Sequence, residues 1–163
     1  MRARAVALCV LATLAFTSPA FPAVEQGTIV VNRGAAGVKL GMTRAQVVAL
    51  LGKPLFQNAH GYMQYSKKNL LDVYLNPATK RVRLIGISGP RFCTLKGVCM
   101  MKDGGLAKLK AQYGAALEKT VAEDGEVSYE VNGVHNGKKV FTSFFPGATK
   151  PRAAIIQIFV GFR

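Results

Sequence analysis

The sequence holds few of the residues on which catalysis and metal binding depend. Its 163 residues include no tryptophan, three cysteines, two histidines and eight acidic side chains. His60 and His135 lie far apart, and neither belongs to a cluster with metal-ligand spacing. No nucleophile elbow, zinc-protease, phosphate-loop or dinucleotide-binding motif is present. We therefore predict a protein that is not an enzyme and that needs no cofactor and no metal.

Acidic side chains are scarce, and the only cluster of them predicts a turn. Glu123, Asp124 and Glu126 flank Gly125 in a polar stretch just before an apolar run. This setting is typical of a solvated turn, whereas a glycosidase pair needs two carboxylates facing one cleft. We expect His60, in a short polar turn, and His135, in a hairpin, to be turn residues rather than catalytic bases.

After the first 20 residues the chain has no long hydrophobic run. Arginines occupy positions 2 and 4, and an uninterrupted apolar stretch follows at residues 5–16. This stretch is too short to span a bilayer and has the length of a signal-peptide core. Ser18 and Ala20 supply the small residues that cleavage after residue 20 requires, and cleavage after residue 23 is the alternative. We predict a signal peptide at 1–20 and a periplasmic or secreted mature protein that is not transmembrane.

Cysteine is rare, and its positions predict one disulfide and no lipid anchor. Cys9 lies inside the apolar stretch and follows Leu8 rather than a small residue, so lipidation is not expected. Removal of the signal peptide leaves Cys93 and Cys99. An even pair in an exported protein predicts a disulfide bond, with a metal site or free thiols as the alternatives.

The scarcity of acids leaves a strongly basic chain. Its formal net charge is +14, and loss of the two leading arginines leaves 20 basic residues against eight acidic ones. Residues 33–102 hold 12 basic residues and one acid, Asp72. Such a charge favours an anionic partner, namely an acidic protein, anionic lipid or cell-wall polymer, unless the lysines and arginines only solvate the surface. Export argues against nucleic acid. We predict an exposed electrostatic binding patch at Lys80, Arg81 and Arg83.

One short helix is defined by its end signals. Thr43 is a predicted N-cap, and Gln46 completes a capping box. A glycine at position 52, followed by Pro54, predicts the end of the helix. The residues expected on its buried side are Val47, Leu50 and Leu51.

Strand patterns follow this helix, and then the order repeats. The first set of strands is predicted at 62–65, 70–75 and 82–88. A second helix is predicted to end at Gly114, with strands at 127–131, 139–145 and 153–162 and a turn at Asn132–Gly133. The aromatic and aliphatic residues expected in the core near the C-terminus are Phe141, Phe144, Phe145, Ile156, Ile158, Val160 and Phe162.

This order predicts an α+β fold. Two tandem helix–β–β–β units would join their strands into one antiparallel sheet, with both helices on one face. We expect a lead-in at 24–36, a first unit at 37–92 and a second unit at 93–163, all within one globular domain.

The segment at 37–54 carries a family resemblance. Its core, G-M-T-x-x-x-V-x-x-x-x-G from Gly41 to Gly52, resembles the opening of the SmpA/OmlA (BamE-type) domain and the repeat unit of β-lactamase inhibitor protein. The second unit is similar only in pattern, because Asp103–Gly104–Gly105 replaces Met-Thr. The resemblance implies a BLIP-like tandem fold. It assigns no contacting residues, because the shared positions are structural.

We therefore expect a non-catalytic, exported protein-binding module of the bacterial cell envelope. Two alternatives remain: an inhibitor or immunity protein that blocks an extracytoplasmic enzyme, and a basic binder of anionic lipid or cell-wall polymer.

Overall fold

The computed structural model describes residues 24, 26–67, 70–150 and 152–163. The predicted signal peptide, both of its candidate cleavage sites and Cys9 lie outside these residues. None of the helices in the described ranges has the length and apolar character needed to cross a membrane.

The larger of two sheets has eight strands, and every neighbouring pair is antiparallel. In spatial order the strands are β4 (Phe56–Gln57), β5 (Tyr62–Gln64), β6 (Leu71–Leu75), β7 (Val82–Ile87), β12 (Ile155–Phe162), β11 (Lys138–Pro146), β10 (Val127–His135) and β9 (Leu117–Val121). Buried and less buried residues alternate along β6, as expected for a strand with one face on the core. β7 and β12 join the first four strands to the last four.

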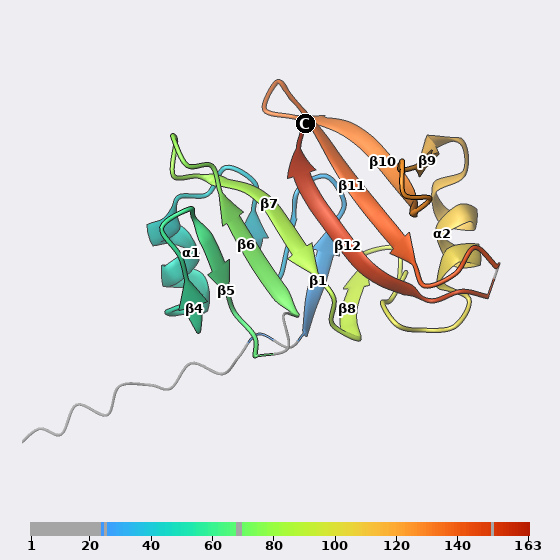
Figure 1. Cartoon of the computed structure of the whole chain (residues 1–163), viewed down its shortest axis with the longest axis horizontal. Coiled ribbons are helices and arrows are strands. Elements are labelled where there is room, and N and C mark those ends of the chain that lie inside the picture. The colour runs from blue at the N-terminus through green and yellow to red at the C-terminus, as the bar shows by residue number, and fades with distance from the viewer. Residues whose placement is uncertain (1–23, 25, 68–69, 151) are drawn as a thin grey trace, which may run out of the picture.

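A smaller sheet of four strands covers the middle of the larger one (Figure 1). It is formed by β3 (Val38–Lys39), β2 (Gly34–Ala35), β1 (Gln26–Val30) and β8 (Arg91–Thr94). β1 and β8 are parallel, and β2 packs against β7 and β12. Ile29 and Phe92 are fully buried between the two layers.

The helices lie toward the two ends of the large sheet (Figure 1). α1 (Arg44–Leu51) lies beside β4, where the Arg44 guanidinium donates a hydrogen bond to the side chain of Gln57. α2 (Gly105–Tyr113) is followed by a 3₁₀ turn, η1 (Gly114–Ala116). The last residue of the helix, Tyr113, packs against Phe144 of β11.

The predicted α+β fold of two tandem helix–β–β–β units is wrong. The described chain is mostly strand, 47% against 15% helical, and it forms two sheets rather than one. Residues expected to be a lead-in form β1 and β2, and the parallel pairing of β1 with β8 builds the second sheet. This small sheet, rather than a layer of helices, covers the centre of the large sheet.

The first helix has the predicted ends. The Thr43 side chain accepts a hydrogen bond from the Gln46 N–H, the Gln46 side chain accepts one from the Thr43 N–H, and Gly52 is the C-cap with φ 81°. Val47 is fully buried, but Leu50 is 47% exposed, so its predicted burial is wrong. The small sheet lies toward the Leu50 side of the helix, and Leu50 Cδ2 contacts Gly37 there, at 3.2 Å from where a Cβ atom would stand.

The predicted turn at Asn132–Gly133 is also wrong. β10 continues through these residues, and the hairpin turns at Asn136–Gly137, whose positive φ angles of 51° and 73° suit a two-residue turn. Gly133 has a packing role instead, since a Cβ atom there would stand 2.6 Å from Asn32 Nδ2.

The expected core near the C-terminus divides between the two faces of the sheet. Phe144, Ile158 and Val160 are fully buried, as predicted. Ile156 is 45% exposed, and the other three, Phe141, Phe145 and Phe162, are half-buried. The division follows from the alternation of strand side chains, because neighbours such as Phe144 and Phe145 must point to opposite faces.

Candidate binding face

One face of the large sheet carries aromatic side chains across strands from both halves of the chain. No described segment lies over this face, which is toward the viewer in Figure 1. We name it the aromatic face; its rings are Phe56, Tyr62, Tyr74, Phe141, Phe145 and Phe159. Phe56 is 52% exposed and the other five are half-buried.

Strand pairing places these rings in two groups. Tyr62 is directly opposite Tyr74, and their ring centroids are 5.2 Å apart. Phe56 extends this group, with its centroid 6.0 Å from that of Tyr62. On the other half, Phe145 and Phe159 meet edge to face at 5.7 Å. Such tilted contacts are favourable geometries for aromatic pairs.

Two glycines on the central strands let rings lie against the backbone. A Cβ atom at Gly86 would stand 3.0 Å from the Phe159 ring, and one at Gly161 would stand 2.9 Å from the Phe141 ring. The space beside Gly86 is therefore filled by the Phe159 ring, and the space beside Gly161 is filled by the Phe141 ring together with Leu84, whose Cδ1 would stand 2.7 Å from that Cβ atom.

The carboxylates on this face already have hydrogen-bond donors. Tyr62 Oη donates to Asp72 at 3.0 Å, and the Asn132 amide donates to Glu118 at 2.8 Å. Glu130 accepts from Ser143 Oγ at 2.7 Å and forms an ion pair with Arg163. The face thus contains satisfied acceptors between apolar rings.

Burial changes the protonation behaviour of the tyrosine group. Burial, followed by the hydrogen bond to Asp72, raises the pKa of Tyr62 to about 12. Burial also raises the pKa of Asp72, although the hydrogen bond from Tyr62 acts in the opposite direction. Tyr62 therefore remains a protonated donor to Asp72 at neutral pH.

The predicted electrostatic residues lie in or next to the turn between β6 and β7, and all three are exposed. Lys80 has a positive φ of 54°, and Arg83 is an extra residue at a register shift between the strands. Arg81 is less free than expected, because its guanidinium donates to the Gly41 carbonyl at 3.0 Å. Its replacement would therefore disturb the entry to α1 as well as the surface charge.

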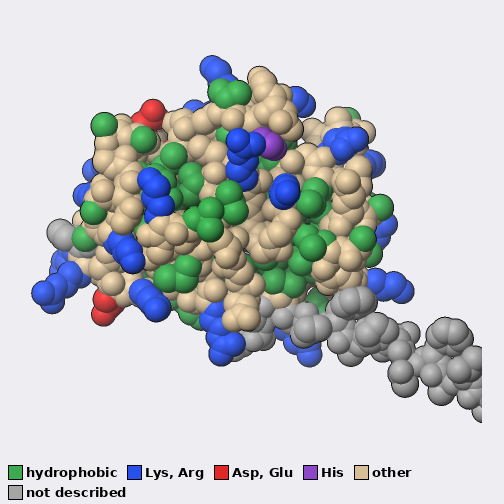
Figure 2. Space-filling model, turned by 180° about the vertical axis from the view of Figure 1, so that it is seen from behind, with side chains coloured by type: hydrophobic (Ala, Val, Ile, Leu, Met, Phe, Trp, Pro, Cys, Tyr) green, Lys and Arg blue, Asp and Glu red, His purple; other side chains and the backbone are tan. Residues whose placement is uncertain are grey.

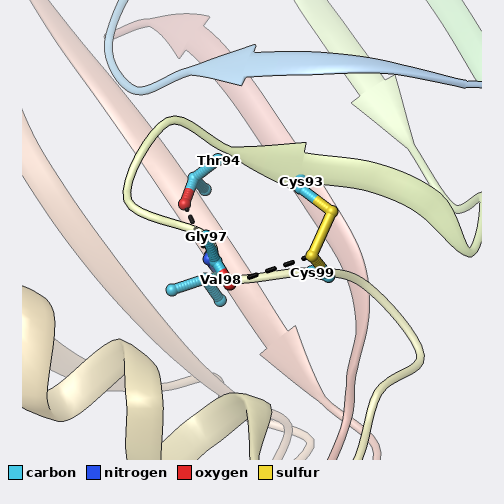
Figure 3. The surroundings of a disulfide bond; sticks show 5 residues. All are labelled: Cys93, Thr94, Gly97, Val98 and Cys99. Atoms are coloured by element: carbon cyan, nitrogen blue, oxygen red, sulfur yellow. Dashed lines mark hydrogen bonds between the residues drawn. A yellow bond between two sulfur atoms is a disulfide. The ribbon is translucent and has the colours of Figure 1, made fainter.

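Cys93 and Cys99 form the predicted disulfide bond (Figure 3). The bond closes a short hairpin after β8, in which the Val98 N–H donates to Thr94 Oγ1 at 3.1 Å and the Thr94 N–H donates to the Val98 carbonyl at 2.9 Å. Leu95, near the tip, is 76% exposed. The hairpin follows a strand of the small sheet, which lies on the other side of the large sheet from the aromatic face (Figure 1).

The residues considered for catalysis are not brought together. Asp124 accepts the Glu126 N–H at 3.0 Å within the acidic turn, and the His60 N–H donates to Asn58 Oδ1 in a second turn. His135 instead contacts Arg33, a partner from the other end of the chain. Within the described ranges, no three His, Cys, Asp or Glu side chains are grouped so that they could hold a metal ion.

Of the six rings on this face, Phe141 and Phe145 were expected in the core. Strict alternation along residues 139–145 would have separated Phe141 and Phe145 from Phe144, so this signal was available. The parallel pairing of β1 with β8, which decides which side of the large sheet is covered, left no such signal. Comparisons with protein-family models, with curated proteins and with solved structures found no match to this chain.

Proposed function

We propose that this protein is an exported, non-catalytic protein-binding module whose partner docks on the aromatic face. A periplasmic or secreted location is part of the proposal. The Cys93–Cys99 bond supports it, because disulfides persist mainly in oxidising compartments outside the cytoplasm.

The observation that carries the proposal is a set of rings on an uncovered sheet face. Phe56, Tyr74 and Phe145 come from strands in both halves of the sheet yet point to the same side. Aromatic side chains lose little conformational entropy on binding and supply large contact areas, so they are enriched where proteins bind each other.

The polar groups of this face also suit binding. Asp72, Glu118 and Glu130 already accept hydrogen bonds from within the chain. A docking partner would therefore not leave them without donors, which lowers the cost of removing water from the face. Ladders of backbone hydrogen bonds hold the strands in place, so the face needs little reorganisation on binding.

The partner in this proposal is a protein of the cell envelope or a secreted enzyme that the module inhibits. Lys80, Arg81 and Arg83 lie in or beside a turn of the large sheet, and their charge would speed the approach of an acidic partner. An envelope partner would keep its activity in the complex, whereas an inhibited enzyme would lose its activity. Assay of the captured partner separates the two cases.

Surface variants test the proposal. The native host would export wild-type protein, a double variant Phe56→Ser with Phe145→Ser, and a control, Leu95→Ser, whose side chain is 76% exposed on the disulfide hairpin. We expect the wild type and the control to retain the same envelope or secreted protein and the double variant to lose it. Equal retention by all three folded proteins would refute docking on this face.

A second candidate function, binding of anionic lipid or cell-wall polymer, is favoured by the opposite side of the molecule. Figure 2 shows many lysine and arginine side chains and few acidic ones on that side. Such binding would weaken steeply as salt is added, because exposed charges are screened. Binding to anionic vesicles that persists at high salt would contradict a purely electrostatic attachment.

A further inference from the structure

A depression with basic and apolar walls lies where the small sheet meets the hairpin of β10 and β11. Its volume is about 330 Å³, within the range of small-ligand sites. Val30, Ala35 and Val38 supply apolar walls, and Arg33, Lys39 and His135 supply the polar groups. Most of its lining belongs to the small sheet and its turns, on the side of the large sheet opposite the aromatic face.

Packing fixes the two walls relative to each other. The turn between β1 and β2 is tied to β11 because the Asn32 N–H donates to Thr142 Oγ1 at 2.7 Å and the Thr142 hydroxyl donates to Asn32 Oδ1 at 3.0 Å. Gly133 leaves the space that the Asn32 side chain occupies. Arg33, the next residue, is thereby held against His135.

Each side-chain polar group of the depression is a hydrogen-bond donor. The Arg33 guanidinium has no acceptor atoms, so its contact with His135 Nδ1 requires that nitrogen to accept. The His135 ring then carries its proton on Nε2, which donates. Lys39 adds an ammonium group, which also only donates.

No carboxylate balances these donors. None of the residues that line the depression is acidic, and the ion pair found among the described residues joins Arg163 to Glu130. Arg33 and Lys39 are therefore two cations beside a depression that lacks an anion. An anionic group bound there would relieve their repulsion and accept their hydrogen bonds.

We propose that this depression binds a small anionic amphiphile: a carboxylate or phosphate head held by Arg33, Lys39 and His135, with an apolar body against Val30 and Val38. This site lies apart from the aromatic face and does not depend on the function proposed for that face.

Octanoate, which has a carboxylate and a short apolar chain, is the primary probe, and hexyl phosphate is the second. Isothermal titration of the mature protein should show saturable binding of both at one site. Octanol lacks the charge and inorganic phosphate lacks the apolar body, so each should bind at least about tenfold more weakly. If inorganic phosphate binds as tightly as hexyl phosphate, the apolar part of the proposal fails.

Charge-removing variants locate the site. Lys39→Gln and Arg33→Gln should each weaken octanoate binding about tenfold, through loss of a charged hydrogen bond. Lys119→Gln removes the same charge from an exposed position on β9, outside the depression, and should leave binding unchanged. Lys39 is exposed, so its variant should fold normally even if Arg33→Gln does not.

Equal weakening by Lys39→Gln and Lys119→Gln would overturn the proposal, because it would show that net charge alone attracts the probe. Absence of octanoate binding at millimolar concentration would also overturn it. Sedimentation with phosphatidylglycerol vesicles, against phosphatidylcholine vesicles, identifies the source of the head group. Vesicle binding that requires Lys39 indicates a membrane lipid, and octanoate binding without vesicle binding indicates a free amphiphile.

Discussion

Asn32 and Thr142, 110 residues apart, exchange two hydrogen bonds across the junction of the two sheets. Thr142 is fully buried on β11, whereas Asn32 stands in the turn between β1 and β2 with a positive φ of 60°. The pair ties the turn between β1 and β2 to β11, next to the residues that line the basic depression.

Replacement of Thr142 by valine tests this link. Thr142→Val keeps the shape but leaves the Asn32 N–H and Oδ1 without their partner, which should lower the free energy of unfolding by about 1–3 kcal/mol. Thr120→Val, at an exposed position on β9, is the control and should change stability by less than about 0.5 kcal/mol. Urea denaturation measures both, and equal values would show that the link contributes nothing.

The first helix should respond to truncation at Val47 and not at Leu50. Val47 is fully buried, so Val47→Ala should destabilise the protein by about 2 kcal/mol through lost burial. Leu50 is 47% exposed and contacts the backbone at Gly37, so Leu50→Ala should cost less than about 1 kcal/mol. A larger loss at Leu50 than at Val47, measured by urea denaturation, would mean that the helix is rotated from the position described.

The disulfide should stabilise its hairpin modestly. Cys93 and Cys99 are six residues apart, and closing so short a loop contributes about 2 kcal/mol on the chain-entropy model. The free energy of unfolding of the double variant Cys93→Ser with Cys99→Ser, measured by urea denaturation, should therefore be lower by about 2 kcal/mol. Mass spectrometry of the exported protein after alkylation without reductant should detect no labelled cysteine. Two labelled thiols would contradict the bond.

Stability should fall at alkaline pH. Burial is the main cause that raises the pKa of Tyr62 and of Tyr65 to about 12, whereas unfolded tyrosine titrates near 10. Below about pH 10 both tyrosines are protonated in the folded and in the unfolded protein, so their contribution to the free energy of unfolding is complete. Between about pH 10 and 12 the unfolded chain loses these protons while the folded protein keeps them, and the free energy of unfolding therefore declines. Tyr62→Phe should reduce the slope of unfolding free energy against pH in that interval. An unchanged slope would contradict the assigned environment of Tyr62.

Local signals predicted the ends of the first helix and the disulfide correctly, whereas the local turn signal at Asn132–Gly133 was wrong. The capping box that starts α1 lies within four consecutive residues, from Thr43 to Gln46, and Gly52 marks the end of the helix. The bond between Cys93 and Cys99 likewise followed from proximity along the chain and the expected compartment. Each feature depends on interactions within a few residues, which a sequence displays directly.

Non-local pairings were beyond the reach of these signals. β2, β3 and β4 have two residues each, too few to show alternation, and the parallel partners β1 and β8 lie more than 60 residues apart. Without the small sheet, the covered side of the large sheet was unknown, and Phe141 and Phe145 were assigned to the core. Arg33 and His135 are 102 residues apart and meet through the tertiary fold, so the depression had no sequence signature.

Site-directed photo-crosslinking tests docking on the aromatic face most directly. A photo-reactive phenylalanine analogue would replace Phe145 in one exported protein and Leu95, on the disulfide hairpin, in another. Phe145 is half-buried in the aromatic face and Leu95 is 76% exposed away from it. Irradiation in the native host should give one defined protein adduct from position 145 and none from position 95. An adduct from position 95 alone, or no adduct from position 145, would contradict the account.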